Sequence, residues 1–156
     1  MIGIARHTDY AVRLVLHLAC LEPGTCVPIS EIAQVRQLPV PFLRRLVAPL
    51  VNAGIVGSVR GSQGGLYLTK RPEDISLLDV VKVMEGGVAL NHCVDHLEGC
   101  PFAHHCPVQE AWHNVTRDLE ESMSAVRFDQ LARRSHDHEQ AHRRQTRVER
   151  LTVSEA

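Results

Sequence analysis

The chain has 156 residues, 44% of them hydrophobic and only 4% aromatic, and its formal net charge is −1 at pH 7. This is enough apolar material for one compact domain with an appended element. No apolar run approaches the length of a membrane span, and the N-terminal residues lack the uninterrupted apolar stretch of a secretion signal. We therefore expect a cytoplasmic protein with reduced cysteines and no membrane partner.

The first two elements are predicted to be helices. Residues 9–21 contain no helix breaker and place apolar side chains along one face. Asp9 lies near the start of this helix, where a carboxylate suits the helix dipole. Pro23 ends the helix, and a shorter one is expected from about Ser30, a favourable N-cap, to Gln34.

A third helix is predicted to begin near Pro41, because proline is favoured in the first turn, and to stop near Gly54. Its apolar residues recur at helical spacing, so Arg44 and Arg45 would point outward, opposite the apolar stripe. Pro49 conflicts with this helix because it lacks an amide donor and clashes with the carbonyl one turn earlier. We expect either a kink there or a different register.

A glycine-tipped hairpin follows the third helix. Residues 55–60 and 66–69 are predicted to be strands joined by a flexible turn. Two helices followed by a hairpin are the layout of a winged helix-turn-helix, whose second helix enters the major groove of DNA. The predicted fold is therefore mostly α-helical with a small β-hairpin wing. The candidate DNA-binding residues are Arg44 and Arg45 on the helix and Arg60, Gly61, Gln63 and Gly64 in the wing.

The segment from Ile29 to Arg71 is strongly basic. It holds six basic residues and one acidic residue, a net charge of +5 within a nearly neutral chain. Arginine can bind phosphates or guanine edges, so we expect a surface for double-stranded DNA. The alternative is a solvated face that acidic residues elsewhere balance.

The C-terminal half is also predicted to be helical. A helix over residues 75–84 starts with Ser76 as a cap, and apolar residues from Val108 to about Leu131 step by four and three residues. This pattern predicts a dimerisation helix, and packing onto its own domain is the alternative. The charged tail is expected to be frayed helix or disorder. We expect a winged-helix domain (1–75), a connecting helix and cysteine segment (76–107), a dimerisation helix (108–133) and a tail (134–156).

Three cysteines lie within fourteen residues before the long helix. Cys93, Cys100 and Cys106 have the spacing C-x6-C-x5-C, and the glycine and prolines between them allow the thiols to converge. Converging thiolates bind zinc, copper(I) or an iron–sulfur cluster. The spacing matches neither paired zinc knuckles nor ferredoxin motifs, so zinc and a cluster both stay open. Cys20 and Cys26 are expected to be small buried hydrophobes.

No catalytic signature is present in the sequence. It lacks the C-x-x-C motif of thiol oxidoreductases, and the glycine turn lacks the Lys-Ser/Thr ending of a phosphate loop. The chain is therefore predicted not to be an enzyme.

The stretch EIAQVRQLPVPFLRRLVAPLVNAGIVGSVRGSQGGLYLTKRPEDISLLDVVKVMEG, followed by C-x6-C-x5-C, resembles the Rrf-two (Rrf2) family of bacterial regulators. That family includes IscR, NsrR and RirA, and the likeness runs from about Asp9 to about Leu131. The resemblance implies a homodimeric winged-helix transcription factor. It also implies that the cysteine segment holds an iron–sulfur cluster near the dimer interface and that the long helix crosses to the partner.

The resemblance further implies which residues bind the cluster, with the three cysteines matching the family's ligands. In IscR-like members a histidine three residues after the last cysteine completes a two-iron cluster, and here that position is Gln109. In NsrR-like members an aspartate at the start of the partner's first helix completes a four-iron cluster, and Asp9 has that position. His104 or His105 could substitute, and the other interpretation of Asp9 is a helix-start carboxylate. The expected cofactor is a 4Fe-4S cluster, with 2Fe-2S as the alternative.

The predicted function is a ligand-linked switch. A homodimeric repressor would bind its operator according to the state of the cluster, sensing nitric oxide, redox state or the supply of iron. A coupling free energy of about 1–3 kcal/mol would change operator affinity from several-fold to over a hundredfold. The alternative is a zinc-stabilised winged-helix DNA-binding protein without a sensing role.

Overall fold

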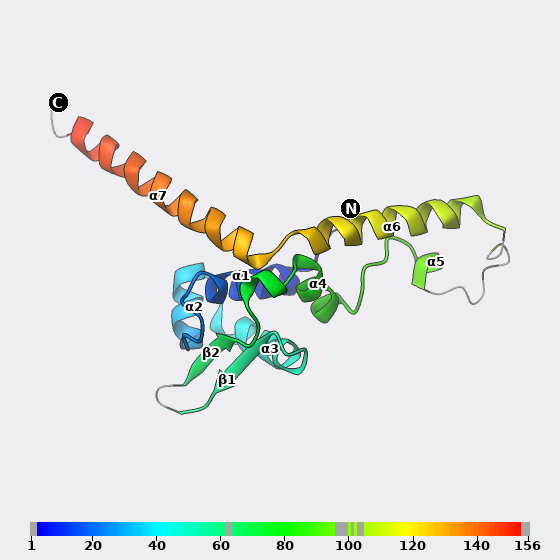
Figure 1. The fold of residues 1–156 in the computed structure, drawn as a ribbon, viewed down its shortest axis with the longest axis horizontal. Coiled ribbons are helices and arrows are strands. Elements are labelled where there is room, and N and C mark those ends of the chain that lie inside the picture. Colours follow the sequence, from blue (N-terminus) through cyan, green and yellow to red (C-terminus); the bar gives the residue numbers. More distant parts are fainter. Residues whose placement is uncertain (1–2, 62–63, 96–99, 101, 103–104, 154–156) are drawn as a thin grey trace.

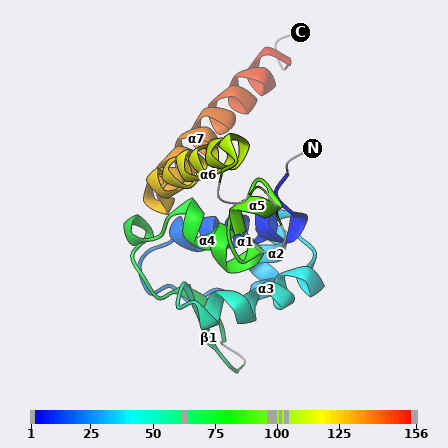
Figure 2. The same ribbon diagram turned by 90° about the vertical axis from the view of Figure 1, so that its right-hand side faces the viewer.

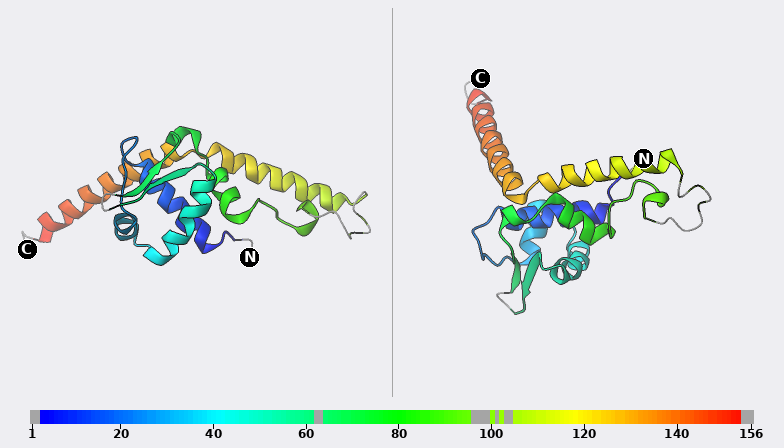
Figure 3. Two further views of the ribbon diagram at one scale, coloured as in Figure 1. Left: turned by 90° about the horizontal axis from the view of Figure 1, so that it is seen from below. Right: turned by 45° about the vertical axis from the view of Figure 1, so that its right-hand side comes forward.

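The computed structural model of the chain describes residues 3–61, 64–95, 100, 102 and 105–153. Within that part it contains seven α-helices, one short 3₁₀ helix and one two-stranded antiparallel hairpin (Figure 1). The first four helices and the hairpin pack together, and the last two helices leave that unit in different directions (Figure 3). The predicted mostly helical fold with a wing is confirmed. None of the described helices is both long and apolar enough to cross a lipid bilayer.

Helix α1 (Arg6–Ala19) occupies the centre of the core because one of its faces is mostly apolar. Leu14 and Val15 on that face are fully buried. Helices α2 (Ile29–Arg36) and α3 (Val40–Asn52) both pack against α1 and against each other (Figure 2). The three helices therefore form one core, and the predicted positions of all three are confirmed to within a few residues.

Helix α3 continues through Pro49 to Asn52 without ending at the proline. Because Pro49 has no amide hydrogen, the carbonyl of Arg45 loses its usual helical donor. Pro41 lies in the first turn, as predicted, where a missing amide hydrogen costs nothing. The apolar stripe of α3 is buried in the core, and this burial holds the helix together across the missing hydrogen bond.

Strands β1 (Val56–Val59) and β2 (Gly65–Leu68) form the antiparallel wing. Strand β2 is also bridged on its other edge, where the backbone amide of Val27 donates to the carbonyl of Leu66 at 2.9 Å and the amide of Leu66 donates to the carbonyl of Val27 at 2.8 Å. Because Val27 lies two residues before α2, this bridge fixes the wing relative to the helix-turn-helix.

The 3₁₀ helix η1 (Pro72–Asp74) leads into α4 (Leu77–Glu85), which starts with a reciprocal capping box. The Asp79 amide donates to the Ser76 hydroxyl at 3.1 Å, and the Ser76 amide donates to the Asp79 carboxylate at 2.7 Å. The predicted cap at Ser76 is confirmed.

Beyond the short helix α5 (His92–Asp95), helices α6 (Pro107–Ala125) and α7 (Phe128–Val153) meet at a sharp corner (Figures 1 and 3). The predicted single helix over residues 108–131 is wrong at this corner. Residues 126–128 instead pair with residues 75–77: the Leu77 amide donates to the Val126 carbonyl at 2.9 Å, and the Phe128 amide donates to the Ile75 carbonyl at 3.0 Å. This non-local pairing takes up backbone groups that a continuous helix would need.

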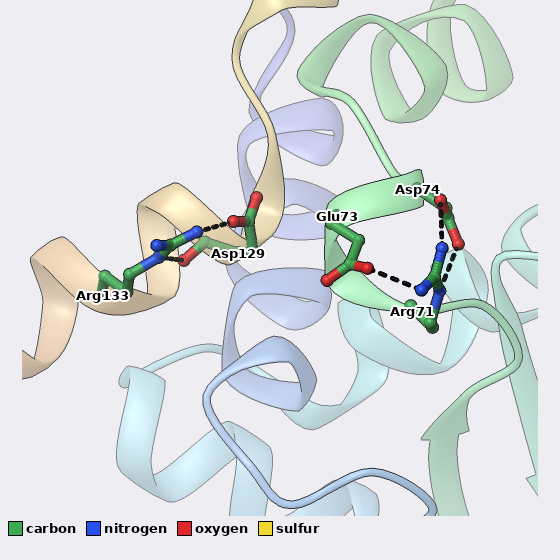
Figure 4. Close-up of polar contacts among 5 residues, drawn as sticks. All are labelled: Arg71, Glu73, Asp74, Asp129 and Arg133. Atoms are coloured by element: carbon green, nitrogen blue, oxygen red, sulfur yellow. Dashed lines mark hydrogen bonds and ion pairs between the residues drawn. The ribbon is translucent and has the colours of Figure 1, made fainter.

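Helix α7 extends to Val153, which differs from the frayed or disordered tail that the composition predicts. Its arginine, glutamate, glutamine and alanine residues favour helix, and its first turn is anchored in the core by Phe128. An ion pair between Asp129 and Arg133 joins adjacent turns (Figure 4). The division of the chain at residues 75, 107 and 133 stays a prediction.

Phe128 at the corner gives a direct test of this anchor. It is 0% exposed, so Phe128→Ala is expected to lower the free energy of unfolding by about 3–5 kcal/mol, through lost burial and the cavity left behind. Phe102→Ala is the matched control because Phe102 is 68% exposed. Urea unfolding followed by circular dichroism would measure both. Equal losses in the two variants would contradict the anchoring role.

Candidate nucleic-acid interface and cysteine segment

The turn between α2 and α3 sets the angle of the helix-turn-helix. Gln37 adopts a left-handed conformation with φ of 51°, and the Leu38 amide returns to the carbonyl of Ala33 at 2.8 Å. Leu38 is buried, so the chain is pinned before α3 begins. The α3 helix is therefore held rigidly against the core, as a DNA-reading helix requires.

The outer face of α3 carries the two predicted arginines. Arg44 and Arg45 are both exposed, on the face opposite the buried Leu43 and Leu46. The Arg45 guanidinium lies 5.8 Å from the centre of the Phe42 ring, which supports it by a cation–π contact. This pairing was not predicted, because the spacing places Phe42 in the apolar stripe although its side chain is exposed.

A groove with a volume of about 460 Å³ lies between the start of α2, the outer face of α3 and the wing. Arg44 lines one side of it, Ser30 another, and Ser58 and Gly61 the wing side. Hydroxyl, backbone and guanidinium groups all face one concave surface here, and these are the groups that bind nucleic-acid phosphates. The serines were not among the residues predicted from sequence.

The wing glycines are required by backbone geometry. A Cβ at Gly64 would lie 2.3 Å from the carbonyl oxygen of Val59, and Gly61 has a φ of +119°. The backbone at the tip of the wing therefore requires glycine at both positions, whether or not these residues contact DNA. Arg60 is exposed at the end of β1, and Gln63 lies outside the described residues.

Part of the positive charge between Ile29 and Arg71 is neutralised by ion pairs. Arg71 forms ion pairs with Glu73 at 2.8 Å and with Asp74 at 2.9 Å, and both partners belong to the same turn (Figure 4). The hydrogen bond from Arg71 holds the pKa of Asp74 below its usual value. Within the described part of the chain, no acidic side chain forms an ion pair with Arg44, Arg45 or Arg60. Positive charge is therefore available at α3 and at the end of β1 next to the wing tip.

The cysteine segment lies at the N-terminal end of α6, away from the wing (Figure 1). Cys93 on α5 and Cys106, the N-cap of α6, are half-buried, whereas Cys100 is exposed, and all three thiols are free. The described residues contain no group of three or more histidine, cysteine or acidic side chains close enough to hold a metal ion. The structure therefore does not bring the three sulfurs together, although their soft donor chemistry fits an iron–sulfur cluster.

Gln109, the position of the histidine ligand in IscR-like members, has a structural contact. Its buried side-chain amide donates to the carbonyl of Cys93 at 3.2 Å and so joins α5 to α6. His105 is exposed, and His104 lies outside the described residues. The contact of Gln109 with Cys93 was not predicted, because it joins residues that are 16 positions apart in the chain.

Asp9 lies in the first turn of α1, where it pairs with Arg13 at 3.0 Å. Its side chain remains about half exposed, so it is accessible to a partner molecule. Both interpretations of Asp9 are compatible with this position.

Glu85, at the end of α4, fixes the turn of α1 that carries Asp9. One carboxylate oxygen accepts from the Ala5 amide at 3.1 Å and from the Thr8 hydroxyl. The hydrogen bond from Thr8 lowers the pKa of Glu85, with a smaller contribution from Ala5, although partial burial acts in the opposite direction. This residue was not predicted, because its partner lies in a distant part of the sequence.

The two Cys predictions outside the trio had different outcomes. Cys20 is half-buried at the end of α1, close to what was expected. Cys26 is exposed, so its predicted burial is wrong. The next residue, Val27, occupies the buried position in the bridge to β2.

The family profile described as Rrf2, iron-dependent transcriptional regulator, matches residues 4–134. This covers both the winged helix and the cysteine segment. The chain belongs to the Rrf2 family. It is accordingly a transcriptional regulator that binds DNA, and the family is not one of enzymes.

Individual Rrf2 proteins agree with this assignment. Protein aau3 of Rhizobium meliloti is 32% identical over 132 residues, which cover 83% of this chain and 84% of that protein. The solved structure of CymR, the global cysteine regulator of Bacillus subtilis, superposes with a TM-score of 0.70 at 29% identity, over 85% of this chain and 97% of that one. The T. potens IscR structure superposes with a TM-score of 0.66 at 28% identity, over 83% of this chain and 86% of that one. None of these findings supports the zinc-stabilised alternative.

The arginines of α3 can be tested individually. Arg44→Ala and Arg45→Ala are each expected to weaken operator binding by about 1–3 kcal/mol, the cost of losing one arginine contact to a base or phosphate. Arg71→Ala is the control, because Arg71 is engaged with Glu73 and Asp74, and it should have a much smaller effect. Fluorescence anisotropy with an operator duplex measures all three. A larger loss for Arg71→Ala would place the interface elsewhere.

The carboxylate of Glu85 gives a pH-dependent prediction. A lowered pKa stabilises the folded state above the unfolded-state pKa, and this stabilisation is lost as the pH falls through the folded-state pKa. Glu85→Gln should therefore lower the free energy of unfolding at pH 7 by no more than about 1 kcal/mol, because the group is exposed. The difference from wild type should shrink in acid. Glu121→Gln, at an exposed position, is the control, and a difference independent of pH would argue against the proposed role of the charge.

Proposed function

We propose that this Rrf2 protein is a homodimeric repressor whose operator binding is controlled by an iron–sulfur cluster bound by Cys93, Cys100 and Cys106. The observation that carries the proposal is the presence of three free cysteines within the fourteen residues that lead into α6, in a family described as iron-dependent. Thiolates are the usual ligands of such clusters.

The fourth ligand is proposed to be Asp9 of the second subunit, with His104 and His105 as alternatives. Asp9 is half exposed at the start of α1, and Glu85 fixes the backbone there through Ala5 and Thr8. A cluster ligated in this way would be of the 4Fe-4S type, with 2Fe-2S as the alternative. When bound, it would supply a group that iron shortage, oxidants or nitric oxide can remove or alter.

The second subunit is proposed to bind along α6. Val108 and Val115 lie on one face of this helix and are 59% and 51% exposed, with the half-buried Trp112 between them. Four- and three-residue steps between these side chains are the spacing of a helix–helix seam. Dimerisation along this face would place two α3 helices on one DNA duplex, with the site of action in the cytoplasm.

The chain contains a physical connection between the cysteine segment and the DNA-reading helix. Gln109 joins α5 to α6, Lys82 of α4 pairs with Glu120 of α6 at 2.8 Å, and the corner at residues 126–128 holds the other end of α6. Helix α4 in turn packs on α1 and α3. A displacement of α6 would therefore be transmitted through α4 to the packing of α3.

The switch is tested by titrating an operator duplex with anaerobically reconstituted protein and with the same protein stripped of iron. The two affinities are expected to differ from several-fold to over a hundredfold, for a coupling of about 1–3 kcal/mol. Cys106→Ser should abolish the difference, and Cys26→Ser, outside the trio, should preserve it. Equal affinities of loaded and stripped protein, or freshly prepared protein that contains zinc and neither iron nor labile sulfide, would reject the proposal.

A further inference from the structure

A second cysteine-centred site lies between α1, α2 and α7, remote in the sequence from the three clustered cysteines. The Cys20 sulfur accepts a hydrogen bond from the Arg36 guanidinium, with Nη2 at 3.7 Å. Cys20 caps the end of α1 and Arg36 is the last residue of α2. Cys20 as a residue is half-buried.

Two nitrogen atoms in this site lack hydrogen-bond partners within the described chain. They are Nε2 of His17 and Nε of Arg36, and both are buried. His17 is only 6% exposed and lies one helical turn before Cys20 on α1. A buried polar atom without a partner costs free energy, and a polar group that bonds to it recovers this cost.

One cation and two carboxylates act on His17. Burial lowers the pKa of His17, and the Arg36 charge lowers it further, while Glu31 on α2 and Glu139 on α7 oppose this effect. An anionic oxygen attached to the Cys20 sulfur would lie next to the Arg36 guanidinium, where it could accept hydrogen bonds from the unpartnered nitrogens.

We propose that Cys20 is a hydroperoxide-reactive thiol whose oxidised form, a sulfenate, is stabilised by Arg36 and His17. In the reaction the Cys20 thiolate attacks one oxygen of hydrogen peroxide. The S–O bond forms, the O–O bond breaks, and the departing hydroxide takes up the proton released by the thiol to give water. The sulfenic acid formed in this way then loses its own proton to solvent and becomes the sulfenate. Sulfur is oxidised by two electrons and the peroxide is reduced.

The position of the site gives the modification a route to the helix-turn-helix. Arg36 directly precedes Gln37, the left-handed residue that starts the turn into α3. A stronger hydrogen bond from Arg36 to an oxidised Cys20 would act on the residue next to this turn. The reactivity itself depends neither on the cluster nor on DNA binding, so it can be tested separately from both.

The test compares two cysteines of the same molecule. Reduced, full-length protein is treated with hydrogen peroxide in the presence of dimedone, which traps sulfenates, and labelling of each cysteine is followed by peptide mass spectrometry. Cys26 is the internal control because it is exposed and has no guanidinium contact in the described structure. Reactivity set by exposure alone would favour Cys26. We expect Cys20 to be labelled about tenfold faster, the effect of one charge-assisted hydrogen bond.

Two variants of Arg36 distinguish an effect of its charge on Cys20 from an effect on folding. Arg36→Met should reduce the Cys20 rate to that of Cys26 or below, and Arg36→Lys should restore part of it. Circular dichroism would verify that both variants are folded, and the wild-type comparison requires no variant at all. A Cys20 rate equal to or below that of Cys26 in wild type, or an unchanged rate in Arg36→Met, would overturn the proposal and leave buried water as the partner of the two nitrogens.

Discussion

The backbone pairing between residues 75–77 and 126–128 is the contact on which the arrangement of this molecule depends. Two hydrogen bonds and the buried Phe128 ring join the segment before α4 to the corner between α6 and α7. Helix α6 also packs on α4 and is joined to it by the Lys82–Glu120 ion pair. The pairing anchors the corner that follows α6 in the core that supports α3, through the buried Phe128.

This arrangement separates the basic face of α3 from the cysteine-bearing segment. Helix α3, whose arginines have no acidic partners in the described chain, lies away from α5 and from the end of α6 where the cysteine-bearing segment enters (Figure 1). A polyanion can therefore bind at α3 without approaching the cysteines. Coupling between the cysteine segment and α3 must pass through the packed helices between them. A displacement of α6 is therefore favoured over direct electrostatic coupling.

The winged helix could be predicted from sequence because its signals are local. Helical spacing, Pro41 in a first turn and the glycines at the wing tip each act within a few residues of the chain. The corner between α6 and α7 could not, because the groups that interrupt the helix at residues 126–128 come from residues 75–77. The support that Glu85 gives to α1 was missed for the same reason: its partners are about 80 residues away.

At the candidate site, too, the contacts between distant residues could not be predicted from the sequence. Spacing and residue type identified Cys93, Cys100 and Cys106, but convergence of their sulfurs needs contacts that a single chain does not provide in its described part. Asp9 is likewise defined by sequence position and by its place in α1, whereas its proposed ligand role needs a second subunit. The groove serines and the contact of Gln109 with Cys93 became visible only in three dimensions.

The central claim is that the state of the cysteine segment reaches α3 through α6 and the corner. Amide hydrogen exchange, measured anaerobically by mass spectrometry on cluster-loaded and iron-stripped protein, tests it most directly. The account predicts that exchange changes at residues 93–106, at the paired segments 75–77 and 126–128, and in α3. Changes confined to residues 93–106, with identical exchange at the corner and in α3, would contradict it.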